Sequence, residues 1–321
     1  MSRPGPTRPR HGARRTASRS PTPRRSRRRR PPARVCRVTP YLDDAVEAVP
    51  LVGGTHHSGW LLTQADGSRQ VVKVTPDVPA GLFEAEAEGL TVLRDSGAIG
   101  APRVIDVGPG HLVIEVLDPL PGFDDGPFWE RLGHALARLH SVRAERFGWP
   151  HDNWLGPTPQ INTWTDDCYE FFVRHRVLRY LREPAAEAAL DAAGRAAVER
   201  ICERLPELVP PSYPALTHGD LWYGNVLAMP DGSPALIDPA VSWSWPEADL
   251  SMMMCSGMTT SDAGSSALDR LFAAYHEVHP PDPGWREHLE LLHIRELLCV
   301  VSQGGPDWGL KGVLNLIRRY G

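Results

Sequence analysis

Residues 218–225, which read HGDLWYGN, constrain the fold of this chain more than any other segment. They place a carboxylate, Asp220, five residues before a carboxamide, Asn225, and another carboxylate, Asp238, follows thirteen residues later at the end of an apolar run. The turn-forming residues 230–233 (PDGS) separate two short apolar runs in between. This pattern predicts a β-hairpin that brings Asn225 and Asp238 to the same edge.

The same spacing occurs in the catalytic loops of kinases of the protein-kinase type, which read H-R-D-L-x-x-x-N and are followed by a metal-binding aspartate. In those loops the Asp faces the attacking hydroxyl and the Asn binds a metal ion. ATP arrives with Mg²⁺, a hard cation that prefers oxygen ligands. The sequence therefore predicts Asp220 as the catalytic base and Asn225 and Asp238 as Mg²⁺ ligands. An isolated HGD tripeptide also forms ordinary turns, so the prediction rests on the complete spacing.

A strand-like run at residues 70–74 (QVVKV) supplies the cation that such a site needs. It resembles the V-A-I-K strand, whose lysine pairs with nucleotide phosphates. The chain has 35 Lys and Arg residues, but only Lys73 and Lys311 are lysines. A lysine in a predicted buried strand therefore indicates a need for a compact ammonium group. The alternative is a surface lysine on an edge strand.

Residues 52–62 read as a turn followed by a strand, about twenty residues before Lys73. Gly53, Gly54 and Ser58 are placed to close over phosphates. The segment lacks a clean G-x-G-x-x-G pattern, and only its position distinguishes it from an ordinary hairpin turn.

A helical period over residues 80–94 follows the lysine and carries Glu84, Glu86 and Glu88. Successive helical positions turn through about 100°, so only one of the three glutamates can pair with Lys73. Spacing alone does not choose among them.

Two further strand-like runs, residues 103–107 and 111–117, complete a predicted five-stranded small lobe. The second run leads into a hinge between lobes, where the backbone of Glu115, Val116 and Leu117 is predicted to face adenine. An ordinary strand end before a Pro-rich loop fits the same letters.

Helical patterns dominate the second half of the chain, over residues 128–142, 163–182, 185–205, 246–258, 265–278, 285–301 and 308–319. The predicted fold class is α+β and bilobal, of the protein-kinase-like kind. It has a small antiparallel five-stranded lobe with one helix and a larger, mostly helical lobe. We expect a tail over residues 1–38, a nucleotide-binding lobe over 39–117 and a catalytic and substrate-binding lobe over 118–321.

These motifs together resemble the fructosamine kinase (ketosamine 3-kinase) family, a branch of the kinase-like fold related to aminoglycoside phosphotransferases. The most specific elements are the HGDLWYGN loop and the G-x-T-P-Q element within residues 152–160 (DNWLGPTPQ). The resemblance spans roughly residues 50 to 310, and the stretches that carry it are residues 83–90, 128–140, 152–160, 218–225, 237–241 and 247–250.

The resemblance implies a role for individual residues. It makes Glu86 the partner of Lys73, and it makes Asp249 a buried carboxylate that braces the catalytic loop. It further implies transfer of the γ-phosphoryl group of ATP to the 3-hydroxyl of a ketosamine, such as a fructosamine or ribulosamine. Phosphorylated ketosamines are unstable and release the amine, so the implied role is deglycation or carbohydrate repair.

Trp222 lies two residues after the predicted base and is predicted to contact the acceptor. An indole face packs on the apolar face of a sugar and attracts a protonated amine through a cation–π contact. The alternative is a core tryptophan that seals the loop.

Three segments depart from the family pattern: residues 56–57 (HH), 242–246 (SWSWP) and 297–301 (LLCVV). All three are expected to border the nucleotide or the acceptor, and residues 242–246 to help select the ketosamine. Three other functions stay open. The chain could be another small-molecule kinase of this fold, acting on an aminoglycoside or amino alcohol, a non-catalytic nucleotide-binding scaffold, or a nucleic-acid binder that works through its basic tail.

The first 34 residues contain thirteen arginines and no acidic residue, and they are expected to be disordered. The remaining residues carry 22 basic against 39 acidic side chains. Such a tail binds nucleic acid non-specifically. A flexible extension, or an upstream start that is not used in the cell, is the favoured interpretation, because the tail lacks aromatic residues and any folded motif.

The five cysteines are odd in number and lack C-x-x-C spacing, which indicates reduced thiols in a cytoplasmic protein. No apolar run approaches the length of a membrane span. The arginine-rich segment is not expected to be a secretory signal, because no apolar h-region follows the arginines. We expect a monomer that acts on a free or protein-bound ketosamine, without a membrane or nucleic-acid partner.

Overall fold

The structure, a computed structural model, describes residues 45–51, 58–75 and 79–321. Contacts between residues divide the chain into residues 1–30 and 31–321, and everything described below belongs to the second unit. The predicted tail over residues 1–38 lies outside the described residues, as do His56, His57, Gly53 and Gly54.

The small lobe is a five-stranded antiparallel sheet with the strand order β1-β2-β3-β5-β4. Its strands are β1 (Ala45–Pro50), β2 (Ser58–Gln64), β3 (Arg69–Val74), β4 (Val104–Gly108) and β5 (His111–Glu115). β3 is central, and its β-branched residues Val72 and Val74 are buried. Lys73 lies opposite Gly59 on β2 and Leu112 on β5. The predicted five-stranded lobe is confirmed, and Lys73 is not on an edge strand.

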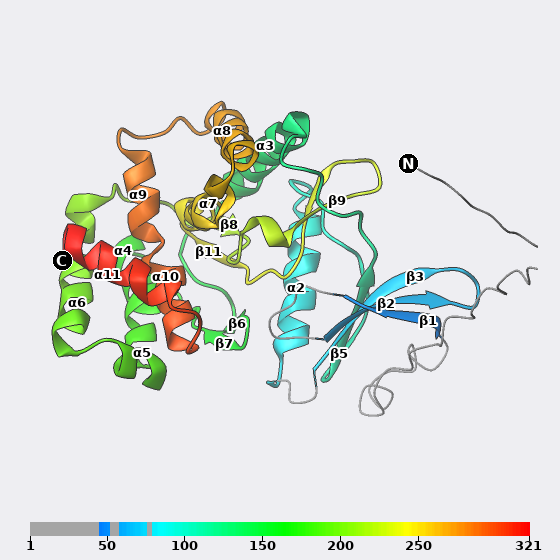
Figure 1. Ribbon diagram of the computed structural model, residues 1–321, viewed down its shortest axis with the longest axis horizontal. Coiled ribbons are helices and arrows are strands. Elements are labelled where there is room, and N and C mark those ends of the chain that lie inside the picture. Colours follow the sequence, from blue (N-terminus) through cyan, green and yellow to red (C-terminus); the bar gives the residue numbers. More distant parts are fainter. Residues whose placement is uncertain (1–44, 52–57, 76–78) are drawn as a thin grey trace, which may run out of the picture. The chain divides into compact units, whose positions relative to one another are not determined.

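Helix α2 (Leu82–Asp95) packs against the large lobe as well as the sheet (Figure 1). Its apolar residues Phe83 and Leu90 belong to one hydrophobic cluster with Leu221 of the catalytic loop. Gly89 makes this approach close, because a Cβ at that position would overlap the ring of Pro239. The helix therefore fixes the small lobe against the segment that follows Asp238.

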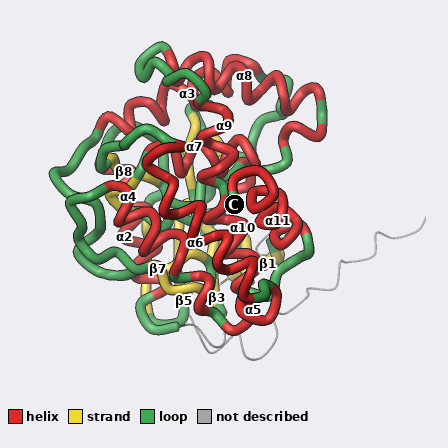
Figure 2. Tube along the Cα trace, turned by 90° about the vertical axis from the view of Figure 1, so that its left-hand side faces the viewer, coloured by secondary structure: helices red, strands yellow, loops and turns green. Residues whose placement is uncertain are grey.

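The large lobe is mostly helical, as predicted (Figure 2). Its α-helices are α3 (Gly126–Ser141), α4 (Cys168–Phe171), α5 (Pro184–Ala189), α6 (Ala192–Leu208), α7 (Pro246–Cys255), α8 (Asp262–His276), α9 (Trp285–Leu292), α10 (Ile294–Ser302) and α11 (Trp308–Tyr320). A π-helix, η2 (Phe172–Leu178), and the short 3₁₀ segments η3 (Tyr180–Arg182), η4 (Tyr223–Asn225) and η5 (Met258–Thr260) complete it.

Three of the predicted helices are wrong in extent. The helix predicted over residues 163–182 begins only at Cys168 and continues as the π-helix η2. The helix predicted over residues 185–205 breaks where the Asp191 side chain accepts a hydrogen bond from the Gly194 amide and caps α6. The helix predicted over residues 285–301 is two helices, α9 and α10, that meet at His293.

Three short antiparallel strand pairs in the large lobe carry the loops of interest (Figure 1). They are β6 (Asn153–Leu155) with β7 (Thr158–Gln160), β8 (Ala215–Thr217) with β11 (Ser242–Ser244), and β9 (Val226–Ala228) with β10 (Pro234–Leu236). The register of the last pair sets Val226 opposite Leu236. The predicted hairpin between Asn225 and Asp238 is therefore confirmed.

Across the described ranges, no helix combines the length and the apolar character that crossing a bilayer requires.

Candidate active site

A cavity of about 760 Å³ is lined by residues of both lobes. It brings together nine residues singled out in the sequence: Lys73, Glu86, Glu115, Val116, Leu117, Asp220, Trp222, Asn225 and Asp238. Ser58 lies at the start of β2, opposite Val74. Asp249 does not line the cavity and is buried behind the catalytic loop.

Lys73 joins the two lobes through its ammonium group. Its Nζ donates hydrogen bonds to Oε1 of Glu86 on α2 and to Oδ1 of Asp238 in the large lobe. Burial works against the charged ammonium, but the carboxylates of Asp238 and Glu86 raise the pKa of Lys73 above its ordinary value. A permanently charged ammonium at this position is suited to bind phosphate oxygens.

The structure chooses among the three glutamates of α2. Glu84 is exposed, whereas Glu86 is buried against Lys73. Glu88 points to the large lobe, where its carboxylate accepts a hydrogen bond from Trp149 Nε1 at 3.2 Å and lies 2.7 Å from His151 Nε2. Because each carboxylate has a different neighbour, only Glu86 can hold the lysine.

Asp220 and Asn225 are joined within the catalytic loop. The Asn225 Nδ2 group donates to the Asp220 main-chain oxygen at 2.8 Å and to Asp220 Oδ2 at 3.1 Å. Burial raises the pKa of Asp220 to about 7, although the nearby Arg295 guanidinium acts in the opposite direction. A carboxylate with a pKa near the working pH is suited to accept a proton from a hydroxyl group.

Asp238 has a left-handed backbone conformation, with φ of 59°, and it alone has a positive φ among the described non-glycine residues. Aspartate tolerates this region better than most residues. The amide of Ile237 donates to the Asn225 carbonyl at 3.0 Å, which sets the Asp238 carboxylate beside the catalytic loop. Its side chain is 38% exposed and lines the cavity.

The oxygen atoms of Asn225 and Asp238 form a donor set that fits a hard divalent cation. The Asn225 nitrogen faces Asp220, so its amide oxygen is the atom that a cation would meet. Two protein oxygens with phosphates and waters in the remaining positions match the way Mg²⁺ binds in ATP-dependent enzymes.

Asp249 holds the backbone of the catalytic loop. Its carboxylate accepts hydrogen bonds from the amides of His218 at 2.6 Å and Gly219 at 2.8 Å, and from His140 Nε2 at 3.3 Å. Burial opposes ionisation, yet these donors keep the pKa of Asp249 below its ordinary value. Gly219 has a φ of 81°, and a Cβ there would overlap the carbonyl oxygen of Ala240, so the tight turn requires glycine.

Trp222 is half-buried and lines the cavity next to Asp220. Its indole lies over Gly224 and packs edge-to-face against Tyr223, with ring centroids 5.3 Å apart. The ring is therefore positioned by its own loop, and its remaining surface is available to a ligand.

The hinge also lines the cavity through Glu115, Val116 and Leu117. β5 ends at Glu115, and the chain is next fixed where Asp118 and Ala228 exchange backbone hydrogen bonds of 2.9 and 3.0 Å. Within the described part of the chain, Val116 and Leu117 make no backbone hydrogen bond. Their N–H and C=O groups are therefore available to the edge of a base.

Two of the segments expected to border the ligands do not reach them. Residues 242–246 form β11 and its continuation, and Trp245 is buried against Phe172 with ring centroids 5.1 Å apart. Residues 297–301 lie on α10, and all of them except Val300 belong to the same hydrophobic cluster as Trp245. Neither lines the cavity, so the expectation was wrong for both. Alternating small and aromatic residues at 242–246 suit a buried strand.

Sequence reasoning missed Arg295, whose guanidinium donates to the Gly219 carbonyl at 2.7 Å and to Gln160 Oε1 at 3.0 Å. Gln160 belongs to the G-x-T-P-Q element, so the motif was visible but its partner was not. Arg295 lies 75 residues after Asp220 in a helical pattern that is mostly apolar, and no local spacing links the two.

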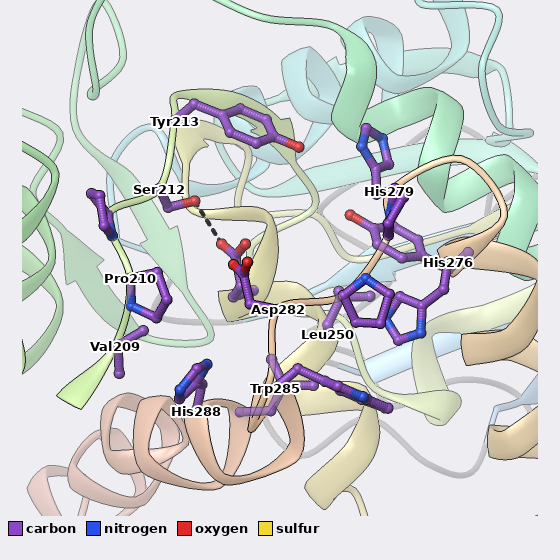
Figure 3. A pocket seen from close by; sticks show the side chains of 16 residues that line it. Val209, Pro210, Ser212, Tyr213, Leu250, His276, His279, Asp282, Trp285 and His288 are labelled. Atoms are coloured by element: carbon purple, nitrogen blue, oxygen red, sulfur yellow. Dashed lines mark hydrogen bonds between the residues drawn. The ribbon is translucent and has the colours of Figure 1, made fainter.

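A smaller hollow of about 240 Å³ lies elsewhere in the large lobe (Figure 3). It is lined by residues of α7, α8, α9 and the segments 209–213 and 279–282, among them Tyr213, His276, Asp282 and Trp285. The Ser212 hydroxyl donates to Glu247 Oε2 at 2.6 Å across it. None of the predicted site residues lines this hollow, and no group of three or more His, Cys, Asp or Glu side chains fit to hold a metal occurs in the described residues.

A family model and many known proteins are similar to this chain, among them a chloroplast protein and two proteins with crystal structures. The family described as fructosamine kinase matches residues 39–311. A chloroplast protein-ribulosamine 3-kinase of Oryza sativa subsp. indica is 29% identical over 256 residues, which cover 77% of this chain and 71% of the relative. A candidate fructosamine-3-kinase of Thermobifida fusca has a crystal structure with a TM-score of 0.74 and 34% identity, over 85% of this chain and 94% of that chain.

The third protein, a thermostable mutant of the aminoglycoside phosphotransferase APH(4)-Ia, has a TM-score of 0.59 at 14% identity, over 86% of this chain and 95% of that chain. At this identity the likeness shows the fold alone. The matches confirm the predicted kinase-like fold, which this chain shares with an aminoglycoside phosphotransferase.

Proposed function

Because the chain belongs to the fructosamine kinase family, we propose that it transfers the γ-phosphoryl group of ATP to the 3-hydroxyl of a ketosamine. The observation that carries this proposal is the junction at Lys73, which is bonded to both Glu86 and Asp238 in a cavity that also contains Asp220. A lysine, a base and metal-binding oxygens in one cavity are the parts that ATP-dependent phosphoryl transfer requires.

In the proposed mechanism, each residue acts through position and charge. Lys73, held by Glu86, orients the phosphates, and Asp220 accepts the proton of the attacking hydroxyl. Mg²⁺, bound by Asn225 and Asp238, would neutralise charge on the phosphates. Most of the rate enhancement then comes from alignment and electrostatic stabilisation.

We assign the nucleotide to residues 39–117 and the acceptor and catalytic groups to residues 118–321. In this assignment Gly53, Gly54 and Ser58 cover the phosphates. The available backbone groups of the hinge residues, Val116 and Leu117, support placement of the adenine there.

The acceptor is proposed to lie on Trp222, since the indole borders the cavity beside Asp220. A ketosamine presents a sugar face and a protonated amine, and an indole attracts both. The reaction would serve deglycation in the cytoplasm. We propose that the protein acts as a monomer.

The test is to incubate the purified protein with ATP, Mg²⁺ and a panel of fructosamines, ribulosamines, aminoglycosides and amino alcohols, and to follow product mass. Phosphorus NMR of the product identifies the modified hydroxyl. The Asp220→Asn variant is the control, because it keeps the shape of the side chain and removes the base. The proposal fails if no ketosamine is phosphorylated or if Asp220→Asn reacts at the wild-type rate.

The same panel tests the alternatives. Preference for an aminoglycoside or amino alcohol would show another small-molecule kinase of this fold. Nucleotide binding without turnover of any acceptor would show a non-catalytic scaffold. Removal of residues 1–34 is expected to leave the rate unchanged, and salt-dependent RNA or DNA binding that disappears with them would reveal a nucleic-acid binder.

A further inference from the structure

Arg295 on α10 contacts the catalytic loop at the Gly219 carbonyl. It is 2% exposed and does not line the cavity. Its Nη2 donates to the carbonyl oxygen of Gly219 at 2.7 Å and to Oε1 of Gln160 at 3.0 Å, and its Nη1 donates to the Glu296 carboxylate. The Gly219 carbonyl belongs to the peptide that leads into Asp220.

The second partner of Arg295 is fixed in turn. Gln160 Nε2 donates to the carbonyl oxygen of Ala240 at 2.9 Å, two residues after Asp238. The amide of Ala240 donates to the carbonyl oxygen of His218 at 2.8 Å. Arg295, Gln160 and Ala240 therefore close a ring of hydrogen bonds around the start of the catalytic loop. The ring ties that loop to the segment that carries Asp238.

The Arg295–Glu296 pair is a poor source of stability. Both side chains are buried, and the free energy needed to remove two charges from water offsets most of their mutual attraction. Within the described residues, Arg295 Nε and Glu296 Oε2 make no hydrogen bond. Buried polar atoms without a partner are costly, so their presence calls for an explanation other than stability.

We propose that Arg295 is a positioning residue for phosphoryl transfer, which holds the Gly219 peptide so that the Asp220 carboxylate stays aligned with the acceptor hydroxyl. Glu296 supplies the counter-charge that allows a guanidinium at this depth. The proposal rests on the proposed function, because it assigns Arg295 to the reaction at Asp220. Arg295 acts through the loop, since it does not reach the cavity itself.

The first test replaces Arg295 by lysine. An ammonium group retains the charge beside Glu296, but it lacks the planar fork that reaches Gly219 and Gln160 together. We expect Arg295→Lys to lower kcat by about 10- to 100-fold, the loss that a small misplacement of a catalytic group causes. KM for MgATP should stay within about twofold, because Lys73 and the hinge are untouched.

Two matched variants separate positioning from packing. Arg176→Lys changes another arginine that is 2% exposed, which donates to Ile161, Asn162 and Ser242 but to no residue of the catalytic loop. We expect Arg176→Lys to keep kcat within about threefold of the wild type, because the Gly219 carbonyl retains its donor. Glu296→Gln removes the counter-charge that holds the Arg295 guanidinium, so it should lower kcat in the same direction as Arg295→Lys and leave KM for MgATP within about twofold.

Hydrogen exchange provides a readout that is independent of turnover. Arg295→Lys should speed exchange of the amides of residues 219–221, whereas Arg176→Lys should leave them at the wild-type rate. If the wild-type protein phosphorylates no ketosamine, the proposed function fails and exchange alone decides the role of Arg295. The proposal would be overturned if Arg295→Lys had the kcat and the amide exchange rates of the wild type. It would also be overturned if Arg295→Lys and Arg176→Lys lost kcat equally.

Discussion

The position of the Trp222 indole over Gly224 allows a sharp test of the acceptor site. A Cβ at position 224 would overlap three ring atoms of that indole, which are the atoms nearest to it. The φ of Gly224 is not in the left-handed region, so alanine fits the backbone. Gly224→Ala should therefore displace the indole without straining the loop.

The size of the effect follows from what the indole contributes. A cation–π contact with an ammonium group is worth about 0.5–2 kcal/mol. Loss of that contact corresponds to roughly a 2- to 30-fold rise in KM for the ketosamine. KM for MgATP should not change, because Lys73 and the hinge lie elsewhere in the cavity.

Steady-state kinetics on Gly224→Ala, Trp222→Ala and the double variant show whether Gly224→Ala acts by displacing the indole. If the alanine acts only by moving the indole, it has no further effect once the indole is gone, and the two losses are not additive. Additive losses, or a rise in KM for MgATP in Gly224→Ala, would refute the reasoning. An unchanged KM for the ketosamine in Trp222→Ala would remove Trp222 from the acceptor site.

Four further outcomes are expected. Lys73→Met should lower kcat/KM by about 100-fold and destabilise the fold by about 3 kcal/mol in urea titrations, because two carboxylates lose their shared counter-charge. Activity should fall as the pH drops below about 7, where Asp220 takes up a proton. Because burial raises the pKa of Asp220 in the folded protein, ionisation of this group lowers the free energy of unfolding as the pH rises from about 4 to 7. Asp220→Asn has no such cost, so its melting temperature should be above that of the wild type at pH 7 but not at pH 4. Gly89→Ala should destabilise by about 1–3 kcal/mol in the same titrations, since its methyl group meets Pro239.

The relative positions of Asp220, Asn225 and Asp238 could be predicted from the sequence because they are fixed by residues close to them in the chain. A five-residue loop and a short hairpin fix the three side chains, and the turn at residues 230–233 closes that hairpin. Lys73 was accessible for a different reason, since a single lysine among β-branched residues is conspicuous in a chain that uses arginine.

Contacts between distant segments were not accessible from spacing. Glu86 could be chosen over Glu84 and Glu88 only through family resemblance or through the neighbours of each carboxylate in the structure. Arg295 reaches Gly219 through tertiary packing alone. The departure at residues 242–246 suggested acceptor selection, but all of its side chains except that of Trp243 are buried where β11 pairs with β8.

The position of α2 has a consequence for how the site is assembled. In protein kinases the equivalent lysine–glutamate pair must be brought into place by movement of a helix and ordering of a loop. Here Gly89 of α2 is packed on Pro239, and Glu88 of α2 bonds Trp149 of the large lobe. Moving α2 would break both contacts and would expose apolar surface of the hydrophobic cluster that α2 shares with the large lobe. We therefore expect the lysine–glutamate pair to form together with this packing, without a separate ordering step.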